Sequence, residues 1–304
     1  MRSLTMQRNK RANSECSNQC SVSTRRANTI EVFITLLHAM TYCLAIHVND
    51  GFVLCSDSRT NAGTDNVSIY SKMFTFAWPG ARFFTLLSAG NLATTQAVVK
   101  KLKSDIPAGM VPNLTTVTTM QEAADYVGMV STQLQKSHSN RDMGCTNFES
   151  TFILAGQIDN QPTEMFMVYP QGNYIHESPE HPFLQIGEFK YGKPILDRVI
   201  KRDVFIERAA RCALVSMNST IRSNVTVGPP IEMLIYRRDS LDEGKRIVFR
   251  EDDPFAAQMS EKWNEGLLMA LQNLPRFDWE EPAKPDDAAD RDDDGRVLSF
   301  PSSA

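Results

Sequence analysis

The chain has 304 residues, a hydrophobic fraction of 42% and a formal net charge of −4. This composition is sufficient for a packed core, and so mild a charge gives no basis for binding nucleic acid or an acidic membrane. The two ends differ: residues 1–39 contain six Lys and Arg against two acidic residues, whereas 276–304 contain four against nine. Neither end has the apolar periodicity of packed elements. We therefore expect a disordered extension at 1–39, a folded domain at 40–275 and an acidic disordered tail at 276–304.

Cysteine usage and the absence of a targeting pattern indicate the compartment. Most of the six cysteines lie in apolar runs, where buried free thiols are common, and none has the companion histidines of a zinc site. The apolar run at 30–37 is too short for a bilayer span, which needs about 20 residues, and lacks the small residues of a signal-peptide cleavage site. We therefore expect a reduced, cytoplasmic protein without a membrane partner.

Alternating apolar and polar residues begin abruptly at Thr41, and Asp50-Gly51 marks a hairpin turn between the first two predicted strands. Later strand patterns are likewise bounded by Gly, Pro, Asn and Asp. The predicted strands cover residues 40–48, 52–59, 71–77, 83–90, 149–158, 163–169, 173–176, 231–236 and 246–249.

Helix predictions rest on capping residues followed by apolar residues at helical spacing. Asn91 is suited to cap one helix, and Thr119 with Glu122 forms a capping-box pattern before the next. The predicted helices cover residues 92–106, 120–136, 193–200 and 203–217, and a last helix starts at 254. Its apolar residues form a row spaced by four, namely Phe255, Met259, Trp263, Leu267 and Leu271.

Two blocks of antiparallel strands with helix pairs between them predict an α/β (α+β) fold, a four-layer α/β/β/α sandwich of two antiparallel sheets. The regular strand–helix alternation of a dinucleotide-binding fold is missing. Residues 187–193 contain glycines and lysines but lack the spacing and the Lys-Ser/Thr ending of a phosphate-binding loop. The histidines form no metal-ligand pattern, so no metal site is expected.

An N-terminal threonine can act as a nucleophile without a separate base, because its α-amine, with a pKa of about 7.7–8.0, accepts the hydroxyl proton. Removal of Met40 would give Thr41 such an amine. A nearby cation, held by a buried carboxylate, lowers the amine pKa, and a glycine N–H can stabilise the oxyanion. Lys72, Asp57 and Gly90 offer these groups, each at the end of a predicted strand or in the adjoining turn.

Each of these residues also has an ordinary structural interpretation when taken alone. Asp57 suits a turn or an ion pair, Lys72 a solvated strand position, and Gly90 a turn before a helix. The lysines at 100–103 are interpreted as a solvated helix face and not as a nucleic-acid site. The set of four residues is therefore more informative than any of its members.

Thr41, Asp57-Ser58-Arg59, Lys72 and Ala89-Gly90 resemble the β-subunits of proteasomes and of the related bacterial HslV peptidases. Residues 185–198 and 223–230 are more particularly similar to Anbu, a bacterial proteasome-related group. The likeness extends from about Met40 to Leu274. It implies an N-terminal nucleophile hydrolase with the α/β/β/α fold.

The resemblance also implies a role for each residue. Thr41 would be the nucleophile and its α-amine the base. Lys72 would tune this pair electrostatically, Asp57 would orient Lys72, and the Gly90 N–H would contribute to the oxyanion hole. No cofactor is implied.

Three supporting positions depart from the pattern of active proteasome subunits. Glu188 stands where those subunits carry a serine after a Val-Gly pair, and Ser223 and Thr226 stand where they carry an aspartate and then a serine. Such residues support the amine and its proton. Glu188 adds a negative charge, which would raise the amine pKa.

The sequence thus predicts a threonine-type peptidase or amide hydrolase. The resemblance implies a ring-like or spiral homo-oligomer whose sites face an interior space that receives a peptide or protein substrate. The departures leave two alternatives open: a weakly active or inactive proteasome-like scaffold, and a hydrolase of a small non-protein amide. Nothing in the sequence identifies an unfoldase partner.

The residues before Thr41 decide whether its amine is ever free. Either translation starts at Met40, whose removal exposes Thr41, or residues 1–39 are a propeptide. Self-cleaving relatives usually carry glycine before the threonine, whereas this chain carries Met40. The abrupt change in composition at the same point favours a start at Met40.

Overall fold

The computed structural model describes residues 41–61, 67–142 and 146–280. The predicted extension at 1–39 lies outside the described residues, and so do residues 281–304 of the tail predicted at 276–304. The chain divides into two compact units between Ser260 and Glu261, within helix α6 (Pro254–Gln272). Each unit is described by itself.

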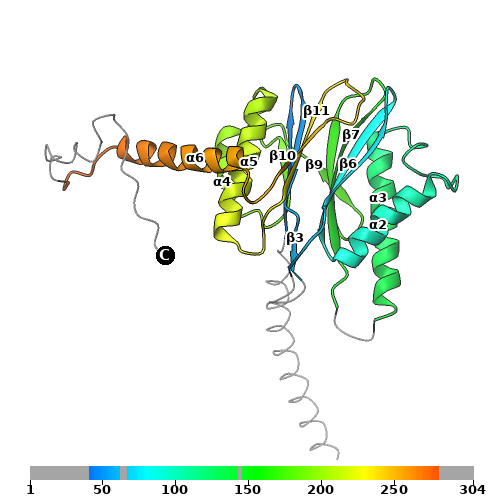
Figure 1. The fold of residues 1–304 in the computed structure, drawn as a ribbon. Helices are drawn as coiled ribbons and strands as arrows, with labels where there is room; N and C mark the ends of the chain where they lie inside the picture. Colours follow the sequence, from blue (N-terminus) through cyan, green and yellow to red (C-terminus); the bar gives the residue numbers. More distant parts are fainter. Residues whose placement is uncertain (1–40, 62–66, 143–145, 281–304) are drawn as a thin grey trace, which may run out of the picture. The chain divides into compact units, whose positions relative to one another are not determined.

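The first unit contains two five-stranded antiparallel sheets that lie face to face (Figure 1). The strand order is β10-β1-β2-β11-β12 in one sheet and β5-β6-β7-β8-β9 in the other. The first sheet consists of β1 (Tyr42–Val48), β2 (Gly51–Ser56), β10 (Phe183–Gly187), β11 (Ile231–Arg237) and β12 (Lys245–Phe249). The second consists of β5 (Met73–Trp78), β6 (Arg82–Gly90), β7 (Ser150–Ile158), β8 (Glu164–Val168) and β9 (Tyr174–His176). A separate short hairpin joins β3 (Arg59–Asn61) and β4 (Val67–Ile69).

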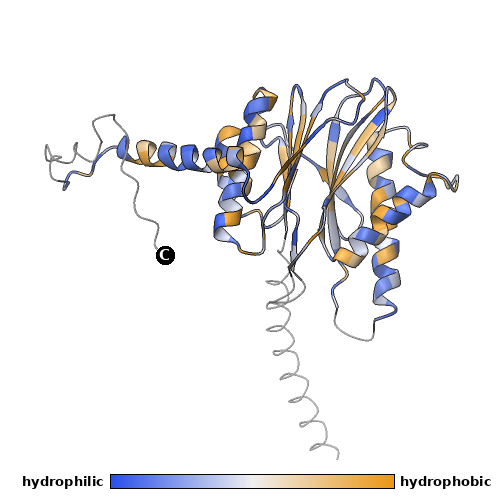
Figure 2. Cartoon of the chain, in the orientation of Figure 1, coloured by the Kyte–Doolittle hydropathy of each residue, from blue (hydrophilic) through white to orange (hydrophobic). Residues whose placement is uncertain are grey.

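Helices cover the outer face of each sheet, which confirms the predicted four-layer α/β/β/α sandwich (Figure 1). Helices α2 (Leu92–Asp105) and α3 (Met120–Ser139) cover the β5–β9 sheet, while α4 (Lys193–Val199) and α5 (Ile206–Ser223) cover the other. Apolar residues accordingly concentrate in the sheets and on the helix faces turned toward them (Figure 2).

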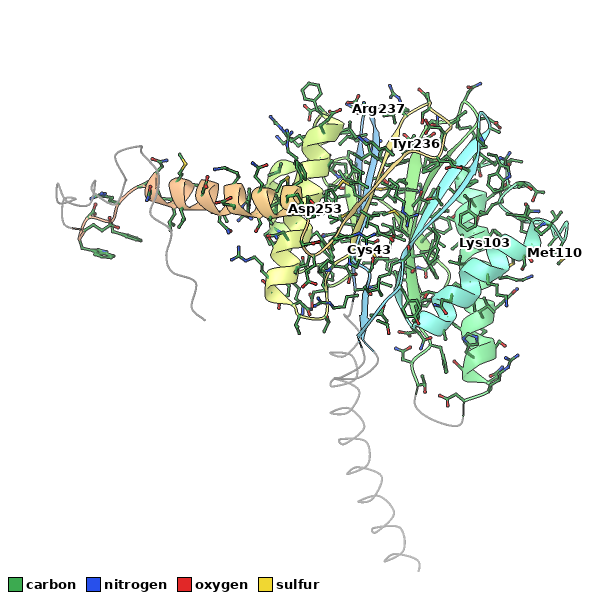
Figure 3. All side chains as sticks on the ribbon, viewed as in Figure 1. Cys43, Lys103, Met110, Tyr236, Arg237 and Asp253 are labelled. Carbon is green, nitrogen blue, oxygen red and sulfur yellow. The ribbon has the colours of Figure 1, made fainter. Side chains whose placement is uncertain are left out.

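Three apolar clusters fill the three spaces between the four layers. The cluster between the sheets contains Cys43 and Tyr236, which Figure 3 labels within the sandwich. Phe83 and Tyr236 come from opposite sheets, and their rings stack with centroids 4.1 Å apart. Such stacking adds to the gain from burying the two rings. The core thereby fixes the distance between the two sheets, on which the candidate site depends.

Local capping explains where α2 and α3 begin. The Asn91 side chain accepts a hydrogen bond from the Thr94 N–H, and Thr119 accepts one from the Glu122 N–H, as the sequence predicts. The Glu122 carboxylate bonds back to the start of the helix. It accepts from the N–H of Thr118 at 2.7 Å and from the Thr118 hydroxyl at 2.9 Å.

Several elements differ from the sequence predictions, among them the short strands β3 and β4, which were not predicted. Strand β10 was not predicted, because Phe183–Gly187 is a short run whose extended form depends on pairing with β1. Helix α5 begins at Ile206 and not at 203, and it continues to Ser223. Its N-cap, Phe205, makes no side-chain capping bond, whereas the buried Thr220 donates to the Ser216 carbonyl within the last turns.

Helix α6 forms where the apolar row predicted it, but it contains no buried residue. Within the first unit, Ala256 and Met259 pack against the apolar cluster beneath α5. Within the second unit, Leu267 and Leu271 are exposed, and Phe277 and Trp279 stack on each other at 5.1 Å. Of the apolar row, Met259 therefore packs in the first unit, while Leu267 and Leu271 of the second unit are exposed.

Candidate active site

The four predicted active-site residues lie at strand ends. Thr41 directly precedes β1, and Asp57 directly follows β2, which pairs with β1. Lys72 directly precedes β5, and Gly90 ends β6, which pairs with β5. Antiparallel pairing places the start of one strand beside the end of the next, so each pair of residues shares an edge of its sheet.

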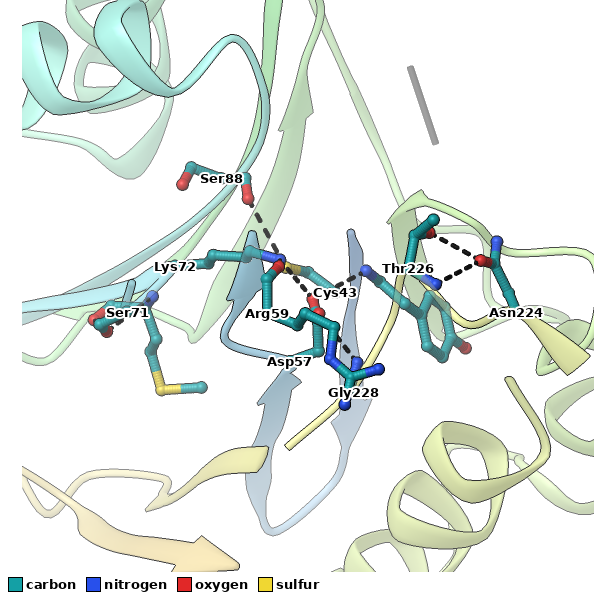
Figure 4. Close-up of polar contacts among 11 residues, drawn as sticks. Cys43, Asp57, Arg59, Ser71, Lys72, Ser88, Asn224, Thr226 and Gly228 are labelled. Carbon is teal, nitrogen blue, oxygen red and sulfur yellow. Dashed lines mark hydrogen bonds and ion pairs between the residues drawn. The ribbon is translucent and has the colours of Figure 1, made fainter. Parts of the chain in front are cut away.

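Asp57 and Lys72 form a buried ion pair between the two sheets, with 2.7 Å between Lys72 Nζ and Asp57 Oδ1 (Figure 4). Asp57 is 0% exposed and Lys72 is 5% exposed. Lys72 Nζ also donates to the Arg59 carbonyl at 2.6 Å. A buried ammonium and carboxylate are tolerated only when they are paired and hydrogen-bonded in this way.

The Asp57 carboxylate also binds the backbone of two other segments. Its Oδ1 accepts from the Tyr42 N–H at 3.0 Å, and its Oδ2 accepts from the Gly228 N–H at 3.3 Å (Figure 4). Burial raises the pKa of the Asp57 carboxyl, while the Lys72 ammonium and these two donors oppose the rise. One carboxylate therefore fixes the Lys72 ammonium next to the residue that follows Thr41.

The backbone of Thr41 is held against strand β10. Thr41 is 8% exposed, and its carbonyl accepts from the Glu188 N–H at 2.7 Å, one step beyond the last register pair of β1 and β10. Gly187 has a φ of +82°, a left-handed conformation that glycine adopts without a steric penalty. A Cβ at this position would collide with the Thr41 carbonyl. The close approach of the two strands here requires glycine.

Asn224 connects two of the three supporting residues. Its Nδ2 donates to Glu188 Oε2 at 3.2 Å. Its Oδ1 accepts from Thr226 N at 2.9 Å and from Thr226 Oγ1 at 2.6 Å (Figure 4). Glu188 is buried, and the ammonium of the exposed Lys190 lies 3.9 Å from its Oε1. Ser223, the third supporting residue, is the exposed last residue of α5. The residue that joins this group is therefore Asn224 and not Ser223.

Strand β6 brings a second set of backbone groups to Lys72. The Ser88 N–H donates to the Lys72 carbonyl at 3.0 Å, and the Ser88 carbonyl accepts from Cys43 Sγ at 3.6 Å (Figure 4). Burial raises the pKa of the Cys43 thiol well above its ordinary value, so this thiol stays protonated. Gly90 follows two residues later with a φ of +107°, and a Cβ there would collide with the Glu149 carbonyl.

The sequence predicted no role in this region for three further groups, namely the Asn224 side chain, the Arg59 carbonyl and the Gly228 N–H. The Asn224-Val225-Thr226 segment does carry a local signal, because asparagine often bonds the N–H two residues on. Gly228 carries none, since its N–H reaches Asp57 across 171 positions. A Cβ at Gly228 would also overlap the Arg59 guanidinium, which donates to the Val225 carbonyl.

The described residues contain no group of three or more His, Cys, Asp or Glu that could bind a metal ion. Over the same ranges, the helices are too short or too polar to span a lipid bilayer.

Several solved structures are similar to this chain. Anbu (ancestral beta-subunit) from Yersinia bercovieri is 40% identical with a TM-score of 0.74, and the match covers 78% of this chain and 99% of that one. The Anbu complex from Pseudomonas aeruginosa, described as a helical assembly, is 42% identical over 79% of this chain and 99% of its own, with a TM-score of 0.75. Anbu from Hyphomicrobium sp. strain MC1 is 40% identical over 78% and 100%, with a TM-score of 0.72.

No protein-family model matches the chain, and no curated protein does. The structural neighbours have the proteasome-like fold of N-terminal nucleophile hydrolases, which is the layered arrangement found here. The sequence identity of 40–42% over nearly the whole length of each relative shows that this chain and these relatives belong to one family. The chain belongs to the Anbu family of proteasome-like proteins.

Proposed function

We propose that this protein is a threonine-type amide hydrolase that acts on peptides, with Thr41 as its nucleophile. The observation that carries the proposal is the shared carboxylate of Asp57, which binds both the Lys72 ammonium and the Tyr42 N–H. A cation held in this way beside the residue after Thr41 would lower the pKa of a free α-amine and stabilise the alkoxide.

In the proposed reaction the Thr41 hydroxyl attacks the scissile carbonyl and its proton passes to the Thr41 α-amine. The Gly90 N–H would stabilise the resulting oxyanion, since it lies at the end of β6 on the Lys72 side of the site. The amine must be free, so the residues preceding Thr41 have to be absent from the active form. No cofactor takes part in this scheme.

Glu188 and Asn224 tune this reaction in the proposal. Glu188 is buried and has an N–H bond to Thr41, and Asn224 holds its carboxylate. A carboxylate near the Thr41 amine would favour the ammonium form and so weaken the base at neutral pH. This supports a slow hydrolase, or an inactive scaffold as the alternative function. Hydrolysis of small non-protein amides is the second alternative.

We also propose a homo-oligomer, in line with the description of the Pseudomonas aeruginosa relative as a helical assembly. A reduced, cytoplasmic setting fits Cys43, Cys55 and Cys212, which are buried free thiols.

The test compares the protein beginning at Thr41 with a Thr41→Ala variant of the same length. Intact-mass analysis establishes the first residue of each protein. Turnover of a peptide library and of small amides should be lost in the variant, while the oligomer, measured by light scattering, stays unchanged. Turnover that persists in Thr41→Ala would rule out this nucleophile. If only small amides are cleaved, the protein is a hydrolase of small amides and not a peptidase. If an electrophile selective for N-terminal threonine does not label the wild-type protein, the scaffold function is favoured.

A further inference from the structure

A second polar cluster lies at the opposite end of β1 from Thr41. His47 is the sixth residue after Thr41, which places it about 20 Å away at about 3.3 Å per residue along a strand. The cluster joins β1 to the segments around Thr163, Glu177 and Arg202. None of these residues contributes to the Thr41 site.

The cluster is a linear chain of carboxylate, imidazole and hydroxyl. Glu177 Oε1 lies 2.6 Å from His47 Nδ1, and Thr163 Oγ1 lies 2.9 Å from His47 Nε2. An ionised carboxylate only accepts hydrogen bonds, so Nδ1 carries the proton. In a neutral imidazole Nε2 is then the acceptor, and the Thr163 hydroxyl donates to it. This order of donors is that of a base-activated nucleophile.

The surroundings keep these protonation states. Burial lowers the pKa of His47 below its ordinary value of 6.5, and the Glu177 bond opposes the shift only in part. Although burial alone would raise the pKa of Glu177, the His47 bond and the Arg202 charge lower it. Arg202 Nη1 lies 3.3 Å from Glu177 Oε1 and donates to the His47 carbonyl at 3.3 Å. Arg202 thereby positions both groups.

The hydroxyl end of the chain lies at a cavity of about 310 Å³. Thr163 and His47 line it, together with the charged Arg202, Arg238 and Asp239. Asn49, Asn160 and Gln161 also line it, and Gln161 Nε2 donates to the Thr118 carbonyl. This volume is at the small end of ligand sites. An oxyanion formed there would need guanidinium or amide N–H donors from these lining residues.

We propose that Thr163, His47 and Glu177 form a second acyl-transfer site, which hydrolyses esters with a short acyl group. Thr163 Oγ1 attacks the ester carbonyl and its proton passes to His47 Nε2. The bond to the alcohol breaks, and His47 returns the proton to the leaving alkoxide. Water then attacks the acyl-threonine with its proton taken by His47, which releases the carboxylic acid and restores the Thr163 hydroxyl. Glu177 and Arg202 position the imidazole.

The test uses the full chain with Thr41→Ala, so that the first site cannot react. A fluorophosphonate should add to Thr163 with loss of fluoride, as mapped by peptide mass spectrometry, and p-nitrophenyl acetate should be hydrolysed. Thr163→Val should abolish both reactions and Thr163→Ser should retain them. His47→Gln should lower the labelling rate at least tenfold. The rate of Thr163 labelling in the Thr41→Ala protein should rise with pH as His47 loses its proton, with a midpoint below the ordinary histidine pKa of about 6.5.

A purely structural role for the cluster predicts a different result. The full chain with Thr41→Ala, shown by circular dichroism to be folded, would then carry no phosphonyl group on Thr163, and that result overturns the proposal. Labelling of Thr163 at an unchanged rate in folded His47→Gln also overturns it. Because the label is mapped to a residue, failure at Thr163 is distinguishable from failure at Thr41.

Discussion

Asp57 and Lys72 come from different sheets and meet through one carboxylate oxygen, which the backbone N–H of Tyr42 shares. This geometry ties the position of the Lys72 ammonium to the start of β1. The same contact therefore serves stability, by neutralising two buried charges, and the proposed chemistry, by placing a cation near Thr41.

Lys72→Met should destabilise the fold and abolish the proposed turnover. The change leaves the Asp57 carboxylate buried without its ammonium, which costs about 3–5 kcal/mol. Urea denaturation measures this cost. Lys193→Met is the matched control, because Lys193 and Asp197 form a more exposed ion pair, whose loss costs at most about 1 kcal/mol. Equal losses in the two variants would contradict the importance of burial.

Gly187→Ala should cost more stability than Gly80→Ala, although the two glycines have similar φ values of +82° and +78°. At Gly80 nothing lies near an added Cβ, so only left-handed strain of about 1–2 kcal/mol is expected. At Gly187 the Cβ would displace the Thr41 carbonyl and weaken its bond to Glu188. Thermal unfolding compares the two variants. A smaller loss for Gly187→Ala would show that the β1–β10 contact adapts readily.

Asn224→Ala should reduce the proposed turnover and cost about 1–3 kcal/mol, because Glu188 and Thr226 both lose a partly buried hydrogen-bond partner. Asn218→Ala is the control within α5, the helix that Asn224 follows, since Asn218 bonds Ser260 and not the site. The readouts are chemical denaturation and the rate of peptide hydrolysis. If both variants hydrolyse peptides equally well, Asn224 does not position the supporting residues.

Acidification should destabilise the protein through His47. The pKa of His47 is lowered on folding. Its contribution to the free energy of unfolding is therefore fully present above pH 6.5 and is lost as the pH falls through the folded-state pKa. Urea unfolding at a series of pH values between 7.5 and 5 gives the free energy of unfolding against pH. The slope of this dependence should be smaller in His47→Gln than in wild type. His181→Gln, at an exposed imidazole, should retain the wild-type slope. An unchanged slope in His47→Gln would refute this assignment.

Local sequence signals predicted much of the fold. Asp50-Gly51 joins β1 and β2 by the expected hairpin, and Asn91 and Thr119 cap α2 and α3. These features depend on residues only a few positions apart, so propensity and hydrogen bonding within a short segment determine them. The motif around Thr41, Asp57, Lys72 and Gly90 indicated the proteasome-like group. Residues 185–198 and 223–230 indicated the Anbu family, which the structural neighbours confirm.

Contacts between distant segments could not be predicted in this way. Strand β10 is a strand because β1 pairs with it, and Asn224 rather than Ser223 joins Glu188 because of where α5 ends. The relay of Glu177, His47 and Thr163 had no local pattern, because Glu177 and Thr163 each lie more than 100 positions from His47 in the sequence. The sequence by itself determined most of the elements, the caps of α2 and α3, and the family. Only the stacking of two sheets decided which buried charges and hydroxyls meet, because burial and pairing depend on the whole packed chain.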